Sequence, residues 1–182
     1  EAIRSFQSQA IFYYSFISIN LQRDLTEAKT IDHFMAGNFQ EWKLSPLLIY
    51  ARASLLVHLG LNSEALQVLM ERKKLGNRFS FFYLDYLEGV LRLNNLDLSA
   101  ETNFLFYLDH FKGDTYRISA LRRLAWISLL HGDKTGYSER MREITLIQSP
   151  ISDDDQSALQ AAKEGEIPDV FLLKARLLFD GG

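Results

Sequence analysis

Residues 45–66, SPLLIYARASLLVHLGLNSEAL, decide the fold of this chain. Apolar side chains recur at helical spacing through the first half of this segment, and Ser45 followed by Pro46 is a typical helix start. Gly60 ends the apolar run, and a second helical stretch begins within a few residues. The segment therefore predicts two helices joined by a tight turn.

This helical hairpin recurs along the chain with a nearly constant period. An early position of each second helix repeats at separations of 37, 35 and 37 residues, at Ala28, Ala65, Ala100 and Tyr137. A middle position of each first helix repeats at separations of 37, 36 and 36 residues, at Phe16, Ala53, Gly89 and Ala125. A fixed period of this size indicates stacked helical hairpins rather than one globule. The large Phe16 and Tyr137 make the first and fourth matches looser.

The last fifteen residues, PDVFLLKARLLFDGG, align with the first helix of the quoted hairpin, with Ala175 in the place of Ala53. An apolar stripe at helical spacing is expected to dock this helix on the preceding ones; it consists of Leu172, Ala175, Leu178 and Phe179. We expect the helix to be half of a fifth unit, and the chain to be a fragment of a longer protein. Its uncovered flank would then invite self-association.

An insertion precedes this last helix. Ser152 and the three aspartates that follow it predict a capped, acid-rich helix start, and Gly165 predicts the end of that helix. A calcium loop is the alternative for three aspartates, but the alternating ligands and the later glutamate of such a loop are absent.

These patterns resemble the tetratricopeptide repeat (TPR), a helix-turn-helix unit of about 34 residues. IYARASLLVHLGLNSEAL and FKGDTYRISALRRLAWISLLHGD are similar to its core, with Ala53 and Ala125 as small residues and Gly60 and Gly132 at the turns. FYLDYLEGVLRLNNLDLSAE, KEGEIP and LLKARLLFDGG together resemble the C-terminal part of a bacterial TPR family of unassigned function. The units are longer than the usual period, and the usual proline at the end of each unit is missing.

The resemblance implies an all-α fold, an α-solenoid of antiparallel helical hairpins in a right-handed superhelix. We expect a single TPR-like repeat domain over residues 1–182. Its expected parts are units at about 5–38, 45–75, 79–111 and 115–146, an inserted helix at 152–164 and a half unit at 168–182.

The composition and the lack of known motifs argue against nucleic-acid binding, a membrane span, metal binding and catalysis. The net charge of −3 lacks the basic excess that nucleic acids require, and no apolar run is long enough to span a membrane. The chain has no cysteine, its four histidines form no metal-binding pair, and no phosphate-binding or nucleophile motif occurs. We therefore expect no enzyme activity, no cofactor and no metal.

The candidate binding site follows from the repeat register. If first helices line the concave face, one inner position is occupied by Tyr13, Tyr50, Tyr86 and Arg122, and a position four residues later reaches Trp126. Aromatic and arginine side chains along a groove are typical of peptide recognition. Packing of the same tyrosines between adjacent units is the alternative, because tyrosine is amphipathic.

The expected function is a non-enzymatic scaffold that binds a peptide or another protein on its concave face. The alternative is a structural spacer or self-association segment of a larger bacterial envelope protein, with homo-oligomers formed through the terminal helix. A third possibility is an accessory domain of an enzyme whose catalytic part lies elsewhere. The compartment is not encoded; the resemblance and the lack of cysteine slightly favour the bacterial cell envelope over the cytoplasm.

Overall fold

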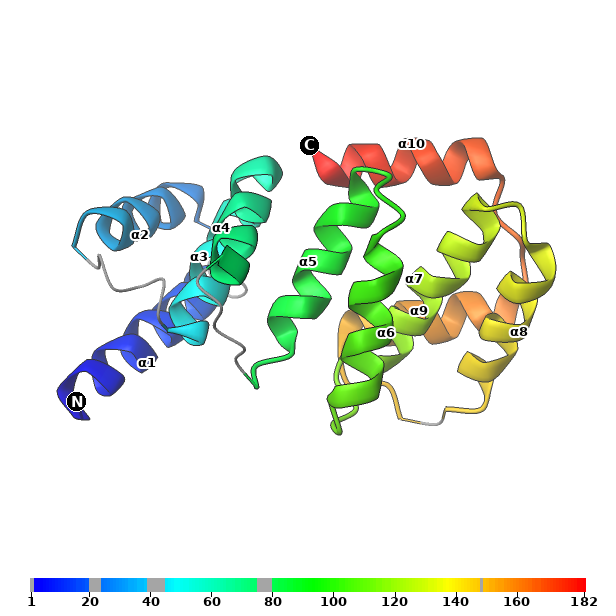
Figure 1. Ribbon diagram of the computed structural model, residues 1–182, viewed down its shortest axis with the longest axis horizontal. Coiled ribbons are helices and arrows are strands. Elements are labelled where there is room, and N and C mark those ends of the chain that lie inside the picture. The colour runs from blue at the N-terminus through cyan, green and yellow to red at the C-terminus, as the bar shows by residue number, and fades with distance from the viewer. Residues whose placement is uncertain (1, 20–23, 39–44, 75–79, 148) are drawn as a thin grey trace. The chain divides into compact units, whose positions relative to one another are not determined.

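The fold is all-α. The structure, a computed structural model, describes residues 2–19, 24–38, 45–74, 80–147 and 149–182, which form ten α-helices and no strand (Figure 1). No helix within these ranges is long and apolar enough to cross a membrane. The chain divides into two compact units, residues 1–84 with Gly182 and residues 85–181, where the sequence predicted one continuous repeat domain.

The first unit is built around its third helix. Its helices are α1 (Ala2–Ile17), α2 (Leu25–Asn38), α3 (Pro46–His58) and α4 (Asn62–Lys74). The central helix α3 contacts the other three and buries side chains on more than one side. Ser45 caps its start as predicted, because its hydroxyl accepts a hydrogen bond from the backbone N–H of Leu48 at 3.5 Å. Gly60 follows the end of α3 with a φ of +75°, a conformation that glycine adopts without strain.

The second unit is built around α7. Its helices are α5 (Tyr83–Asn94), whose first two residues belong to the first unit, α6 (Ala100–His110), α7 (Arg117–Leu130), α8 (Lys134–Thr145), α9 (Asp153–Glu164) and α10 (Val170–Gly181). The central helix α7 contacts α6, α8 and α9, and nine of its fourteen residues are buried. A turn of three residues joins α7 to α8, so the two helices form an antiparallel hairpin.

The predicted units at 45–75, 79–111 and 115–146 each contain two of these helices, and the unit at 5–38 contains α2 and all but the first residues of α1. The predicted insertion contains α9, and the predicted half unit contains α10. The predicted boundaries at residues 75 and 79 lie outside the described residues.

Three of the four predicted small seam residues are buried, namely Ala53, Gly89 and Ala125. Gly89 of α5 lies directly against α6, since a Cβ atom added to it would lie 2.9 Å from Cε1 of Phe104. Phe104 is itself fully buried. The glycine therefore permits an approach of α5 to α6 that no larger residue allows without movement.

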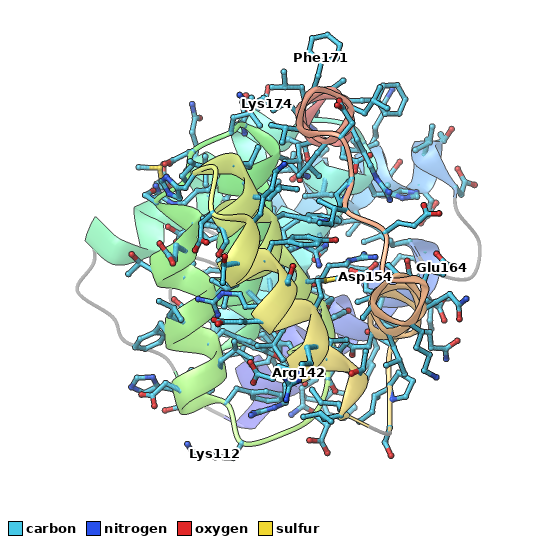
Figure 2. The ribbon with its side chains drawn as sticks, turned by 90° about the vertical axis from the view of Figure 1, so that its right-hand side faces the viewer. Lys112, Arg142, Asp154, Glu164, Phe171 and Lys174 are labelled. Atoms are coloured by element: carbon cyan, nitrogen blue, oxygen red, sulfur yellow. The ribbon has the colours of Figure 1, made fainter. Side chains whose placement is uncertain are left out.

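The fourth seam residue, Ala175, is exposed, and the predicted docking stripe of α10 is wrong. Leu173 and Leu177 are buried instead, whereas Leu172, Leu178 and Phe179 face solvent. The physical reason lies in composition: apolar residues occupy most of the circumference of α10, so their spacing does not select one face. Phe171, also on the exposed side, projects away from the body of the unit (Figure 2).

Candidate functional site

The five predicted site residues fall into the two units. Tyr13 lies on α1 and Tyr50 on α3 of the first unit, whereas Tyr86 lies on α5 and Arg122 and Trp126 lie on α7 of the second unit. A common concave face for all five residues stays a prediction.

In the first unit, Tyr50 belongs to an aromatic cluster. Its ring centroid lies 6.3 Å from that of Phe12, 5.6 Å from that of Phe81 and 6.2 Å from that of Tyr83. Tyr50 is consequently half-buried. Tyr13, in contrast, is 63% exposed and contacts only the edge of this cluster through Phe12, at 5.5 Å. The packing alternative thus describes Tyr50 better than Tyr13.

In the second unit, Tyr86 is an interior residue, only 5% exposed. Its ring stacks on Tyr116 at 4.6 Å between centroids, and its hydroxyl lies 3.0 Å from Oγ of Ser119. Burial raises the pKa of Tyr86 to about 12, because desolvation disfavours the phenolate. Tyr86 does not line an open surface, since α5 packs it against α6 and the start of α7.

Arg122 is also buried, with 6% of its surface exposed. Its Nη1 donates a hydrogen bond to Oγ of Ser157 on α9, at 3.2 Å. Its Nε is fully buried and has no hydrogen-bond partner within the described part of the chain. Burial lowers the pKa of Arg122 to about 10, and the neighbouring charge of Arg123 acts in the same direction. The guanidinium is still charged at neutral pH.

Two guanidinium groups lie over the ring of Trp126. Cζ of Arg122, one turn earlier on α7, is 4.8 Å from the indole centroid, and Cζ of Arg176 on α10 is 6.0 Å from it. Trp126 is half-buried, and the Arg176 side chain is 64% exposed. Cations over an aromatic face are attracted by the ring quadrupole. Arg122, Trp126, Arg176 and Ser157 are called the Trp126 site below.

A single buried carboxylate holds α9 against α7 beside this site. Asp155 Oδ2 accepts a hydrogen bond from the backbone N–H of Tyr116, and Oδ1 accepts one from that of Ser119, both at 2.8 Å. The same Oδ2 accepts from the Ser152 hydroxyl at 2.8 Å, within the capping box that starts α9. Ser157 follows Asp155 by two residues, so this anchor sets where Ser157 meets Arg122.

An ion pair closes the same interface on its outer side. Asp154 Oδ2 lies 3.4 Å from Nη2 of Arg123, whose guanidinium is 5.3 Å from the Tyr86 ring centroid. Asp154 and Glu164, near the two ends of α9, are labelled in Figure 2.

Sequence reasoning missed Ser157 and Arg176. The repeat register contained a signal for Arg176, because it follows Ala175 as Trp126 follows Ala125. Because Trp126 and Arg176 occupy the same position in consecutive first helices, the repeat pattern places their side chains on neighbouring helices. No comparable signal existed for Ser157, since α9 lies outside the repeat.

The described residues hold no group of three or more side chains that could bind a metal ion. Comparisons of the chain with protein-family models, with curated proteins and with solved structures gave no match.

Proposed function

We propose that this chain is a non-enzymatic scaffold, built of TPR-like helical hairpins, that binds a peptide or another protein. The observation that carries the proposal is the half-buried Trp126 with the guanidinium groups of Arg122 and Arg176 over its ring. Tryptophan and arginine are the residues that most often dominate the energy of protein interfaces. Arg122 is already held by its hydrogen bond to Ser157, so little of its side-chain order has to be gained on binding.

A peptide library displayed on phage tests this function with the full chain. We expect selected peptides, resynthesised and measured by fluorescence anisotropy, to bind the wild type and to lose at least about tenfold in affinity with Trp126→Ala, as a hot-spot aromatic predicts. Leu146→Ser is the matched control, because Leu146 is exposed at the end of α8, away from the Trp126 site. Selected peptides that bind Trp126→Ala as tightly as the wild type would contradict the proposal.

A second candidate is self-association through α10, the structural alternative. It is favoured by the exposure of Phe171 and Phe179, 78% and 86%, together with Leu172 and Leu178 on the same helix. Large exposed apolar patches usually mark interaction surfaces. The two candidates share α10, which carries Arg176 as well as the exposed phenylalanines, so Trp126→Ala on α7 is the variant that separates them.

A further inference from the structure

The charge of Arg122 is not compensated by direct contact. No carboxylate of the described residues lies within ion-pair distance of Arg122, and the one side chain that it contacts by hydrogen bonding is the neutral Ser157. A buried charge normally has an ionic partner, because desolvation is costly. A buried guanidinium without one is a candidate for a group that receives its partner from a ligand.

The nearby carboxylates are held by groups other than Arg122. Arg123 and Arg176 are the other cations near Arg122, and the carboxylates are those of Asp154, Asp155 and Asp180. Asp154 lies 3.4 Å from Arg123, Asp155 accepts its hydrogen bonds from Tyr116, Ser119 and Ser152, and Asp180 lies 3.8 Å from Nε of Arg176 in an exposed pair. Exposed ion pairs contribute little free energy, so Arg176 can exchange Asp180 for another anion.

The charged end of Arg122 lies close to the surface. Ser157, its hydrogen-bond partner, is an exposed residue, and Trp126 beside it is half-buried. The hydrogen bond to Ser157 thus brings Nη1 of Arg122 beside a solvent-exposed residue.

From these observations we propose that the Trp126 site binds a side-chain carboxylate of an acidic peptide, held between Arg122 and Arg176 against the indole of Trp126. This inference rests on the proposed scaffold function and names the chemistry of its partner. Arginine binds a carboxylate through two parallel hydrogen bonds, and the Trp126 face suits the apolar stem of the same residue. Nucleic acid is less suitable, because the chain carries a net charge of −3.

Two blocked octapeptides serve as probes, one of alternating glutamate and alanine and one of alternating glutamine and alanine, each with a fluorescein label. We expect the glutamate peptide to bind the wild type at least about tenfold more tightly than the glutamine peptide, as charge-assisted hydrogen bonds predict. Arg176→Gln should remove most of this preference. Lys174→Gln makes the same change of charge on an exposed residue of the same helix, labelled in Figure 2, and should retain it.

Ser157→Asp provides an internal test, because it places a carboxylate beside Arg122. We expect this variant to unfold at a higher temperature than Ser157→Asn and to bind the glutamate peptide at least about tenfold more weakly, since the buried cation then has its partner within the chain. Asp180→Asn should have the opposite effect on the peptide, tightening its binding about twofold or more by freeing Arg176.

Equal affinities for the two peptides, or equal effects of Arg176→Gln and Lys174→Gln, would overturn the acidic-peptide inference. Tighter binding of a labelled oligothymidine than of the glutamate peptide would overturn it in favour of a nucleic acid. The scaffold function fails separately: it is contradicted only if the peptides selected from the library bind independently of Trp126.

Discussion

The carboxylate of Asp155 on α9 accepts a hydrogen bond from the backbone N–H of Ser119 on α7, at 2.8 Å. Tyr116, the N-cap of α7, has no side-chain cap of its own and a left-handed φ of 56°. Asp155 provides the missing side-chain acceptor, because it accepts hydrogen bonds from the backbone N–H groups of both the N-cap and the third helical residue of α7. One carboxylate thereby serves the first turns of two helices.

Asp155→Ala is expected to lower the free energy of unfolding by about 3 kcal/mol, because it leaves the buried N–H of Ser119, the half-buried N–H of Tyr116 and the Ser152 hydroxyl without their acceptor. Urea unfolding followed by circular dichroism measures this loss. Asp153→Ala removes an exposed acid from the same helix turn and should cost no more than about 1 kcal/mol. Similar losses for the two variants would show that helix-end charge, rather than the shared carboxylate, is what matters.

Gly89→Ala and Gly37→Ala should change stability in opposite directions. Alanine favours a helix over glycine by about 1 kcal/mol. At Gly37 of α2 nothing obstructs the added methyl group, so we expect a gain of that order. At Gly89 the methyl group meets the buried Phe104 ring, and overpacking of about 1–3 kcal/mol should outweigh the gain.

Thermal unfolding of both glycine variants provides the measurement. A Gly89→Ala protein that is as stable as wild type would mean that α6 moves away from this position at little cost in free energy.

Tyr86 should make the second unit sensitive to strongly alkaline pH. Because burial raises its pKa to about 12, the folded state keeps the phenol neutral while the unfolded chain ionises from about pH 10. Its contribution to stability is therefore fully present below pH 10 and is lost as the pH rises from 10 to 12, a loss of roughly 2–3 kcal/mol.

The difference in unfolding free energy between wild type and Tyr86→Phe, measured from pH 8 to 12, isolates this effect. At neutral pH the variant should lose about 1 kcal/mol with the hydrogen bond to Ser119, and towards pH 12 it should become the more stable protein. Tyr13→Phe, at an exposed position, controls for the general titration of phenols. A difference that does not vary with pH would exclude Tyr86 as the source.

Phe171→Ser with Phe179→Ser should reduce self-association if α10 is a contact surface. Both side chains lie on the exposed side of α10, so the double change removes apolar surface without touching the buried Leu173 and Leu177. Light scattering over a range of concentrations measures the mass per particle. Leu146→Ser removes an equally exposed apolar side chain on another helix, and an equal effect of that change would argue against a specific role of α10.

The helices and several of their ends could be predicted from the sequence because local chemistry determines them. Ser45 and Ser152 cap helices, and Gly60 and Gly165 follow helix ends with positive φ, each for a reason contained in a few neighbouring residues.

The faces of the helices were harder to predict, as α10 demonstrates. Leu173 and Leu177 are buried and Leu178 is exposed, although all three are equally apolar. Which of these leucines is buried depends on the helices that pack against α10, and those helices come from distant parts of the sequence. Tyr86 illustrates the same limit, since its amphipathic ring suits an open groove as well as the interior position that it occupies.

Only part of the Trp126 site could be predicted, because the sequence places residues together on one helix but does not show which distant helices come into contact. Arg122 and Trp126 share one helix, so their spacing of four residues placed them together. Ser157 and Arg176 reach them from helices that lie more than thirty residues further along the chain, and only folding brings them into contact.

The Asp155 carboxylate has a consequence for hydrogen exchange. The first N–H groups of a helix normally exchange quickly, because they have no partner within the helix. Here the amides of Tyr116 and Ser119 are bonded to a carboxylate that belongs to α9. Their deuterium uptake should therefore follow the opening of α9 rather than the fraying of α7, so that two segments nearly forty residues apart exchange as one cooperative unit.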